Sequence, residues 1–90
     1  MYRLEFTKEA RSDFERLAKS DPTAIKKADK LLLELKEHPT SGTGRPEQLK
    51  GGMSGCWSRR INKKHRLIYR IIDDKVVVLV LSAYGHYNDK

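Results

Sequence analysis

The sequence lacks the features of a membrane-spanning, secreted or disulfide-stabilised protein. Its longest apolar run, Val76 to Leu81, has six residues, whereas a membrane-spanning helix needs about 20. The N-terminal residues show no basic segment followed by an apolar stretch and a small-residue cleavage site, so a secretory signal is not expected. Cys56 is the only cysteine and cannot form an internal disulfide. We therefore expect a protein of the reducing cytoplasm that does not cross a membrane.

Motifs for metal ions and nucleotides are also missing. The histidines and Cys56 show neither C-x-x-C nor H-x-x-x-H spacing, so a structural zinc site is not expected. The stretch from Gly42 to Pro46 does not end in the Gly-Lys-Ser/Thr of a phosphate-binding P-loop. Cys56 suits a small buried hydrophobic residue better than a nucleophile. We expect neither a metal nor another cofactor.

The apolar residues predict one α+β domain covering residues 1–90. Hydrophobic residues make up 38% of the chain, which is enough for one modest core. Periodicity predicts a strand over 2–6, helices from 8 to about 19 and from 22 to a stop at 38–39, and strands over 56–61, 65–72 and 76–84. Thr7 and Asp21 are the expected N-caps of the helices. The order is β-α-α-β-β-β, an antiparallel sheet packed against an N-terminal helical hairpin.

The same patterns predict which side chains are buried. Those expected to face the sheet are Ala10, Phe14, Leu17 and Ala18 on the first helix and Ile25, Ala28, Leu32 and Leu35 on the second. Residues 40–55 contain too many glycines and prolines for a regular element. We expect a long structured loop there, tethered to the core by Leu49.

The excess positive charge is concentrated in the second half of the chain. The net charge is +7, and the span from Lys50 to Arg70 contains seven basic residues and no carboxylate. The seven are Lys50, Arg59, Arg60, Lys63, Lys64, Arg66 and Arg70. Such a segment suits a polyphosphate such as nucleic acid, because binding releases condensed counterions. The alternative is a basic surface that only keeps the protein soluble.

A hairpin with the loop Asn62–Lys64 would place two arginines directly opposite each other. In that register Arg60 faces Arg66, on the side of the sheet away from the helices. Like charges in this position destabilise a strand pair, whereas a bound phosphate would reverse the sign. The alternative is that both arginines point into water or pair with Asp73 and Asp74.

Two further places could supply proton transfer. Glu47 is the one carboxylate of the glycine-rich loop and is followed by Lys50, so it is a candidate general base or simply a solvated loop residue. His86 and Tyr87 follow the last predicted strand. An imidazole donates and accepts protons near neutral pH, although a His-Tyr pair near a terminus can also be ordinary surface.

Taken together, these blocks resemble the YoeB/Txe toxins of the RelE superfamily. The segments that carry the resemblance are 44–50 (GRPEQLK), 54–61 (SGCWSRRI), 65–69 (HRLIY) and 85–87 (GHY). The resemblance implies a toxin of a type II toxin-antitoxin module. Such toxins bind the ribosome and cleave messenger RNA in the A site until a YefM-like antitoxin neutralises them.

The resemblance also implies roles for individual residues. Glu47 would be the general base, Arg66 the transition-state stabiliser, His86 the general acid and Tyr87 an orienting residue. Lys50 and Arg60 would support the phosphate, and Arg59, Lys63 and Lys64 of the basic segment are further candidates for RNA contact. A homodimer is a further expectation. The alternatives are a non-enzymatic ParE-like toxin that binds DNA gyrase, or a basic module that binds RNA or the ribosome without cutting.

Overall fold

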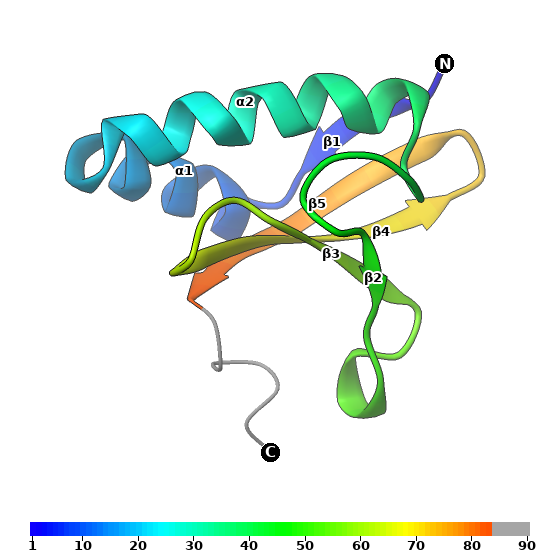
Figure 1. The fold of residues 1–90 in the computed structure, drawn as a ribbon. Coiled ribbons are helices and arrows are strands. Elements are labelled where there is room, and N and C mark those ends of the chain that lie inside the picture. The colour runs from blue at the N-terminus through cyan, green and yellow to red at the C-terminus, as the bar shows by residue number, and fades with distance from the viewer. Residues whose placement is uncertain (84–90) are drawn as a thin grey trace.

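A five-stranded sheet with two helices on one face makes up the computed structural model, which describes residues 1–83 (Figure 1). Strand β1 (Arg3–Phe6) leads into the helices α1 (Lys8–Ser20) and α2 (Pro22–Glu37). A loop then carries the short strand β2 (Glu47–Gln48) and a 3₁₀ turn (Gly51–Met53). The meander β3 (Cys56–Arg60), β4 (His65–Ile72) and β5 (Lys75–Ala83) follows. Neither α1 nor α2, the helices of the described residues, is long and apolar enough to cross a membrane.

The sheet order is β1-β5-β4-β3-β2, and the sheet is mixed. The α+β class and the helical hairpin are confirmed. The prediction of a fully antiparallel sheet is wrong, because β1 pairs with β5 in parallel, with Arg3 opposite Lys75. In the sequence, the two helices separate β1 from the other strands. In space, they cross one face of the sheet and bring the chain back to it. This long connection leaves β1 free to join the open edge of β5 in the same direction.

The loop over 40–55 also contains more regular structure than predicted. Glu47 and Gln48 pair in antiparallel fashion with β3 and form its outer neighbour. The backbone N–H of Leu49 donates to the carbonyl oxygen of Cys56 at 2.9 Å and extends this pairing. The paired segment is only two residues long, too short for a pattern of alternation to reveal it in the sequence.

Side chains cap both helices as predicted. Thr7 Oγ1 accepts from the backbone N–H of Ala10 at 3.0 Å, and Asp21 Oδ1 accepts from that of Ala24 at 3.2 Å. Pro22 opens α2, where its missing N–H leaves no unpaired donor. These caps fix where each helix begins and keep the turn between the helices short.

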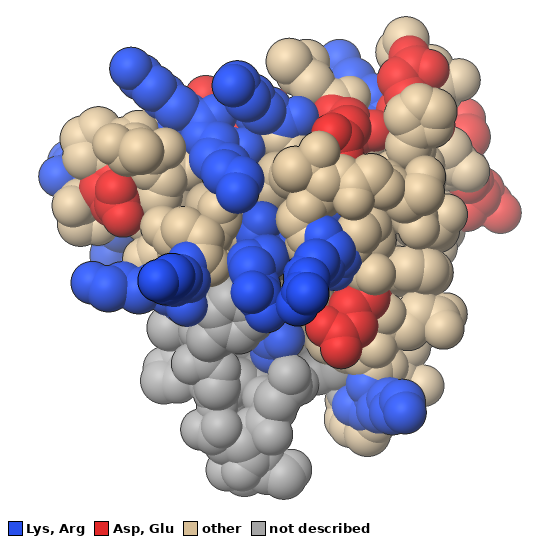
Figure 2. Space-filling view, viewed as in Figure 1, with Lys and Arg blue, Asp and Glu red and all other residues tan. Residues whose placement is uncertain are grey.

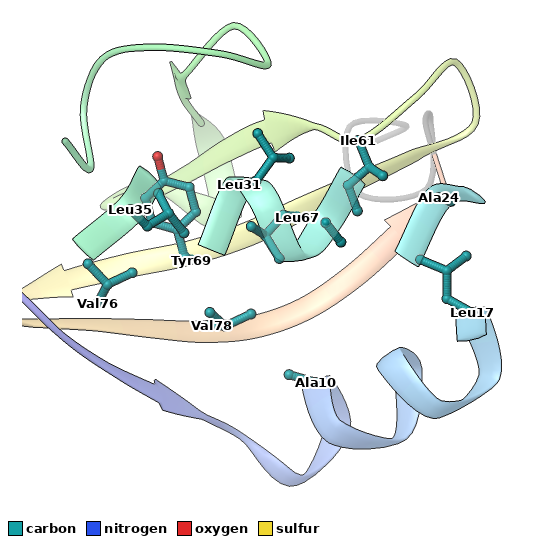
Figure 3. Packing of buried hydrophobic residues seen from close by; sticks show 11 residues of the cluster. Ala10, Leu17, Ala24, Leu31, Leu35, Ile61, Leu67, Tyr69, Val76 and Val78 are labelled. Carbon is teal, nitrogen blue, oxygen red and sulfur yellow. The ribbon is translucent and has the colours of Figure 1, made fainter. Parts of the chain in front are cut away.

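The main core fills the space between the helices and the sheet (Figure 3). Its fully buried members on α2 are Ala24, Ala28, Leu31 and Leu35. The predicted stripe is therefore wrong in part, because Ile25 and Leu32 lie at the margin of the core, partly buried. On α1, Ala18 is exposed. The predicted and the observed sets of buried residues on α2 both have helical spacing. Packing against the sheet determines that the observed set is the buried one.

A second, smaller cluster lies on the opposite face of the sheet. Leu49, Cys56 and Ile68 are buried there, with Leu79 packed against them. The predictions that Leu49 tethers the loop and that Cys56 is a small buried hydrophobic residue are confirmed. This cluster attaches the loop that carries Glu47 to the outer part of the sheet.

Leu31→Ala tests the observed stripe of α2. Leu31 is 1% exposed whereas Leu33 is 65% exposed. We expect Leu31→Ala to lower the free energy of unfolding by about 2 to 5 kcal/mol, because it leaves a cavity in the core. The matched variant Leu33→Ala should change it by no more than about 0.5 kcal/mol. Urea denaturation of both variants provides the measurement, and equal losses would contradict the observed orientation of α2.

Candidate functional site

The β3–β4 hairpin adopts the predicted register. Trp57 pairs with Tyr69 and Arg60 pairs with Arg66. The three-residue loop is closed by Asn62, whose Oδ1 accepts from the backbone N–H groups of residues 64 and 65, both at 2.8 Å. This turn sets the parity of both strands, so one face of the hairpin packs on the helices and the other carries Arg60 and Arg66.

Glu47 joins these arginines on the same face of the sheet. It lies opposite Ser58 on β3, and Ser58 lies opposite Ile68 on β4. Directly paired residues point to the same face, and side chains alternate along each strand. Glu47, Arg60 and Arg66 therefore come from three adjacent strands, β2, β3 and β4, and share the face away from the helices. The outer strands of this set are about 10 Å apart.

The three side chains differ in exposure. Glu47 and Arg60 are exposed, whereas Arg66 is 2% exposed. Lys50 is exposed just after β2, and Lys63 and Lys64 are exposed in the hairpin loop. In Figure 2, Lys and Arg side chains extend over the surface from α2 down to the β3–β4 hairpin. His86 and Tyr87 lie outside the described residues.

Arg59 is buried and does not belong to this face. Its side chain is fully buried, and its guanidinium forms an ion pair with Glu34 of α2. It also donates to three backbone carbonyl oxygens, those of Thr43 at 3.2 Å, Ser41 at 2.6 Å and His38. This burial contradicts the prediction that Arg59 contacts RNA. The strand parity that puts Arg60 on the outer face puts Arg59 on the helix face, so the signal was present in the sequence.

Glu34 is the partner that the sequence alone did not reveal. Its two carboxylate oxygens accept from the backbone N–H and the hydroxyl of Thr43, both at 2.8 Å. Desolvation raises the pKa of Glu34, but the hydrogen bonds from Thr43 and Arg59 and the charge of Arg59 outweigh it, so its pKa is lowered overall. Glu34 is therefore held ionised beside the buried guanidinium.

This network holds the loop that leads to Glu47. The Tyr69 hydroxyl donates to the carbonyl oxygen of Pro39 at 2.5 Å. The backbone N–H of Arg60 donates to the carbonyl oxygen of Gly44 at 2.6 Å. Gly44 has a φ of +85°, and a Cβ there would lie 2.8 Å from the backbone oxygen of Arg60. Only glycine allows this approach without strain. The loop is thus fixed against β3 at Gly44, just before β2 begins at Glu47.

Comparisons with known proteins agree on one family. A model of the YoeB-like toxins of bacterial type II toxin-antitoxin systems matches residues 6–87. Toxin YoeB of Streptomyces coelicolor is 40% identical over 85 residues, covering 94% of this chain and 99% of the relative. The solved YoeB/ParE toxin of Agrobacterium tumefaciens has a TM-score of 0.83 and 33% identity, covering 91% of this chain and 98% of that one.

Two solved Staphylococcus aureus structures are also similar. One is a YoeB-YefM complex, with a TM-score of 0.80, 29% identity and coverage of 91% of this chain and 95% of that one. The other is a YoeB dimer, with a TM-score of 0.79, 30% identity and coverage of 90% and 94%.

Glu34→Gln tests the pairing with Arg59. It keeps the shape of the side chain but leaves the buried guanidinium without a counter-charge, so we expect a loss of about 1 to 3 kcal/mol in the free energy of unfolding at pH 7. Because the pKa of Glu34 is lowered from 4.5 in the folded protein, its charge stabilises the fold above that pH. This contribution is lost as the pH falls through the folded pKa.

Urea denaturation at pH 7 and at about pH 3.5 measures this difference. We expect the gap between the wild-type protein and the variant to shrink at the lower pH. Glu37→Gln, at the exposed end of α2, serves as the control. A gap that is the same at both pH values would show that the charge of Glu34 is not the stabilising feature.

Proposed function

The chain belongs to the YoeB-like toxins of bacterial type II toxin-antitoxin systems, and we propose that it is an endoribonuclease that cleaves messenger RNA in the A site of the ribosome. Cleavage there would inhibit translation in the cytoplasm. The observation that supports this most directly is the register that brings Glu47, Arg60 and Arg66 to one face of the sheet. That face combines a proton acceptor with two cations suited to phosphate.

The proposed reaction uses the nucleophile that RNA itself carries. Glu47 accepts the proton of the 2′-OH, and the 2′-oxygen attacks the adjacent phosphorus. Arg66 and Arg60 balance the negative charge that develops on the phosphorane. His86 then protonates the departing 5′-oxygen, with Tyr87 as its orienting neighbour. The products are a 2′,3′-cyclic phosphate and a 5′-OH.

Arg60 and Arg66 form the proposed binding site for the phosphate that reacts. Arg60 and Arg66 stand at directly paired positions on neighbouring strands, and each guanidinium presents planar donors that match phosphate oxygens. A phosphate bound there would accept charge-assisted hydrogen bonds from both side chains. Because Arg66 is 2% exposed, its contact with RNA requires its surroundings to change when RNA binds.

The ribosome would supply the geometry that the protein alone does not. In-line attack needs the 2′-oxygen, the phosphorus and the 5′-oxygen held in order, and a messenger fixed in the decoding path meets that condition. The exposed Lys50, Lys63 and Lys64 would steer the toxin to this polyanionic surface. We therefore place the three lysines in RNA binding rather than in the chemical step.

The same face is the natural target for inhibition. The solved relative from S. aureus forms a complex with YefM, and we propose that a YefM-like antitoxin binds this chain. An acidic segment of the antitoxin would complement the basic face and exclude RNA. The S. aureus relative also forms a dimer, and we propose the same assembly for this chain.

Glu47→Gln tests the proposed reaction. The change removes the proton acceptor and keeps the shape, so we expect single-turnover cleavage to slow by about 10² to 10⁴. Ribosome binding should change by less than about threefold, because the basic residues remain. Cleavage is followed by mapping the 5′ ends of a messenger on translating ribosomes. Glu37→Gln is the matched control, and an unchanged rate for Glu47→Gln would rule out Glu47 as the base.

The same experiment separates the alternative functions. A ParE-like gyrase inhibitor would leave the messenger intact, and so would a basic module that binds ribosomes without cutting. New 5′ ends produced by the wild-type protein would exclude both.

A leaving-group substitution tests His86. His86→Ala should slow cleavage of ordinary RNA by about 10² or more. It should have little effect on a substrate whose 5′-oxygen is replaced by sulfur, because a thiolate departs without a proton. Both rates are measured in single-turnover reactions on programmed ribosomes. Equal slowing of the two substrates would leave His86 only a positioning or phosphate-binding role.

A further inference from the structure

A basic groove lies on α2, away from the face that carries Glu47. It is about 540 Å³ in volume, and its lining residues are Thr23, Lys26, Lys27, Lys30, Leu31, Glu34 and Thr43. All but Thr43 come from one face of α2, at the spacing of successive helical turns. Thr43 closes the groove from the loop held by Arg59. We call this feature the α2 groove.

The charge of the α2 groove is almost entirely positive. Lys26, Lys27 and Lys30 are exposed. Glu34 is the one acidic residue among the described lining residues, and the buried Arg59 balances its charge. Asp29, the nearest other acid of α2, lines a different groove between α1 and α2. Three lysine charges are therefore left to act on a ligand.

The position of the α2 groove allows it to work together with the reaction face. α2 packs on one face of the sheet, and Glu47 lies on the other. Figure 2 shows Lys and Arg side chains running from α2 across the molecule to the β3–β4 hairpin. Because the two regions lie on different faces of the sheet, an RNA bound at the α2 groove would leave the reaction face open to the messenger.

The lining chemistry indicates which kind of RNA fits. Sites for single-stranded RNA stack bases on aromatic side chains, and none of the described lining residues is aromatic. Lysine ammonium groups and threonine hydroxyls bind phosphate oxygens without reading bases. Backbone contact of this kind is typical of helical RNA, whose shape rather than sequence is recognised.

We propose that the α2 groove binds the phosphate backbone of ribosomal RNA, separately from the messenger at the reaction face. The proposal rests on the proposed function, since it assumes that the ribosome is the place of action. Lys26, Lys27 and Lys30 anchor the toxin to structured RNA, and Glu47, Arg60 and Arg66 act on the messenger. The anchor would raise the local concentration of the reaction face at the messenger without reading sequence.

The triple variant K26A/K27A/K30A tests the α2 groove. Binding to vacant ribosomes and to ribosomes carrying a messenger is measured over a range of salt concentrations. If the three lysines contact phosphates, the slope of log affinity against log salt should fall by about two to three units for both kinds of ribosome. At ~0.1 M salt, binding should weaken by roughly 10- to 100-fold, and the ribosome concentration for half-maximal cleavage should rise in step.

Two matched variants control for net charge and folding. K8A/R11A/K19A removes the same charge from exposed positions of α1, and its salt slope should stay within about one unit of the wild type. K26R/K27R/K30R keeps the charge of the groove and should retain binding. Thermal unfolding of each variant shows whether the fold is intact, and all substituted residues are exposed.

Several results would overturn the proposal. Equal losses in the two alanine variants would show an effect of overall charge. A loss restricted to ribosomes that carry a messenger would assign the groove to the messenger, and loss of antitoxin binding with normal ribosome binding would assign it to a protein partner. Failure of the wild-type protein to cut RNA would reject the proposed function alone, because the binding result for the groove is measured independently of cleavage.

Discussion

The structure depends on one buried guanidinium. Arg59 is fully buried and joins Glu34 of α2 to three carbonyl oxygens of the segment that follows α2. A buried charge is costly unless it is paired and hydrogen-bonded. Both terminal nitrogens of Arg59 have such partners, whereas its buried Nε has none among the described residues, so α2, the loop and β3 have to fit closely around the guanidinium. The same arginine fixes the wall of the α2 groove through Glu34 and Thr43, and it fixes the path of the chain towards Glu47.

Strand parity gives two neighbouring arginines opposite uses. Arg59 points to the helices and is part of the fold, while Arg60 points to the other face and is exposed. The one-residue step between them moves a guanidinium from the core side to the reaction side. Net charge along the chain could not separate these uses, because both residues add equally to it.

Local chemistry made much of the fold predictable. Thr7 and Asp21 cap the helices where the sequence indicated, and Asn62 closes the loop that sets Arg60 opposite Arg66. Each of these features depends on residues a few positions apart.

What the sequence did not reveal depends on contacts between distant segments. The parallel pairing of β1 with β5 joins residues about 70 positions apart in the chain. Two rows of apolar residues on α2 have the same helical spacing, and only packing against the sheet determines which row is buried. Strand β2 exists only because Glu47 and Gln48 pair with β3. Glu34 and Arg59 are 25 positions apart in the chain. Only the folded structure shows that this glutamate forms an ion pair with a buried arginine. His86 and Tyr87 lie outside the described residues, so their part of the candidate site stays a prediction.

The second cluster matters to the site because it holds together the strands that carry Arg60 and Arg66. Ile68 lies on β4 with Arg66, and Cys56 lies on β3 with Arg60. Both are buried on the face away from the helices, and Leu49, just after β2, is buried with them. Full burial of a Leu or Ile side chain contributes about 1.5 to 3 kcal/mol, so this cluster stabilises the attachment of β2 to the β3–β4 hairpin. Apolar packing therefore fixes the backbone around Glu47, Arg60 and Arg66, and the change that the proposed RNA contact of Arg66 requires can be confined to side chains.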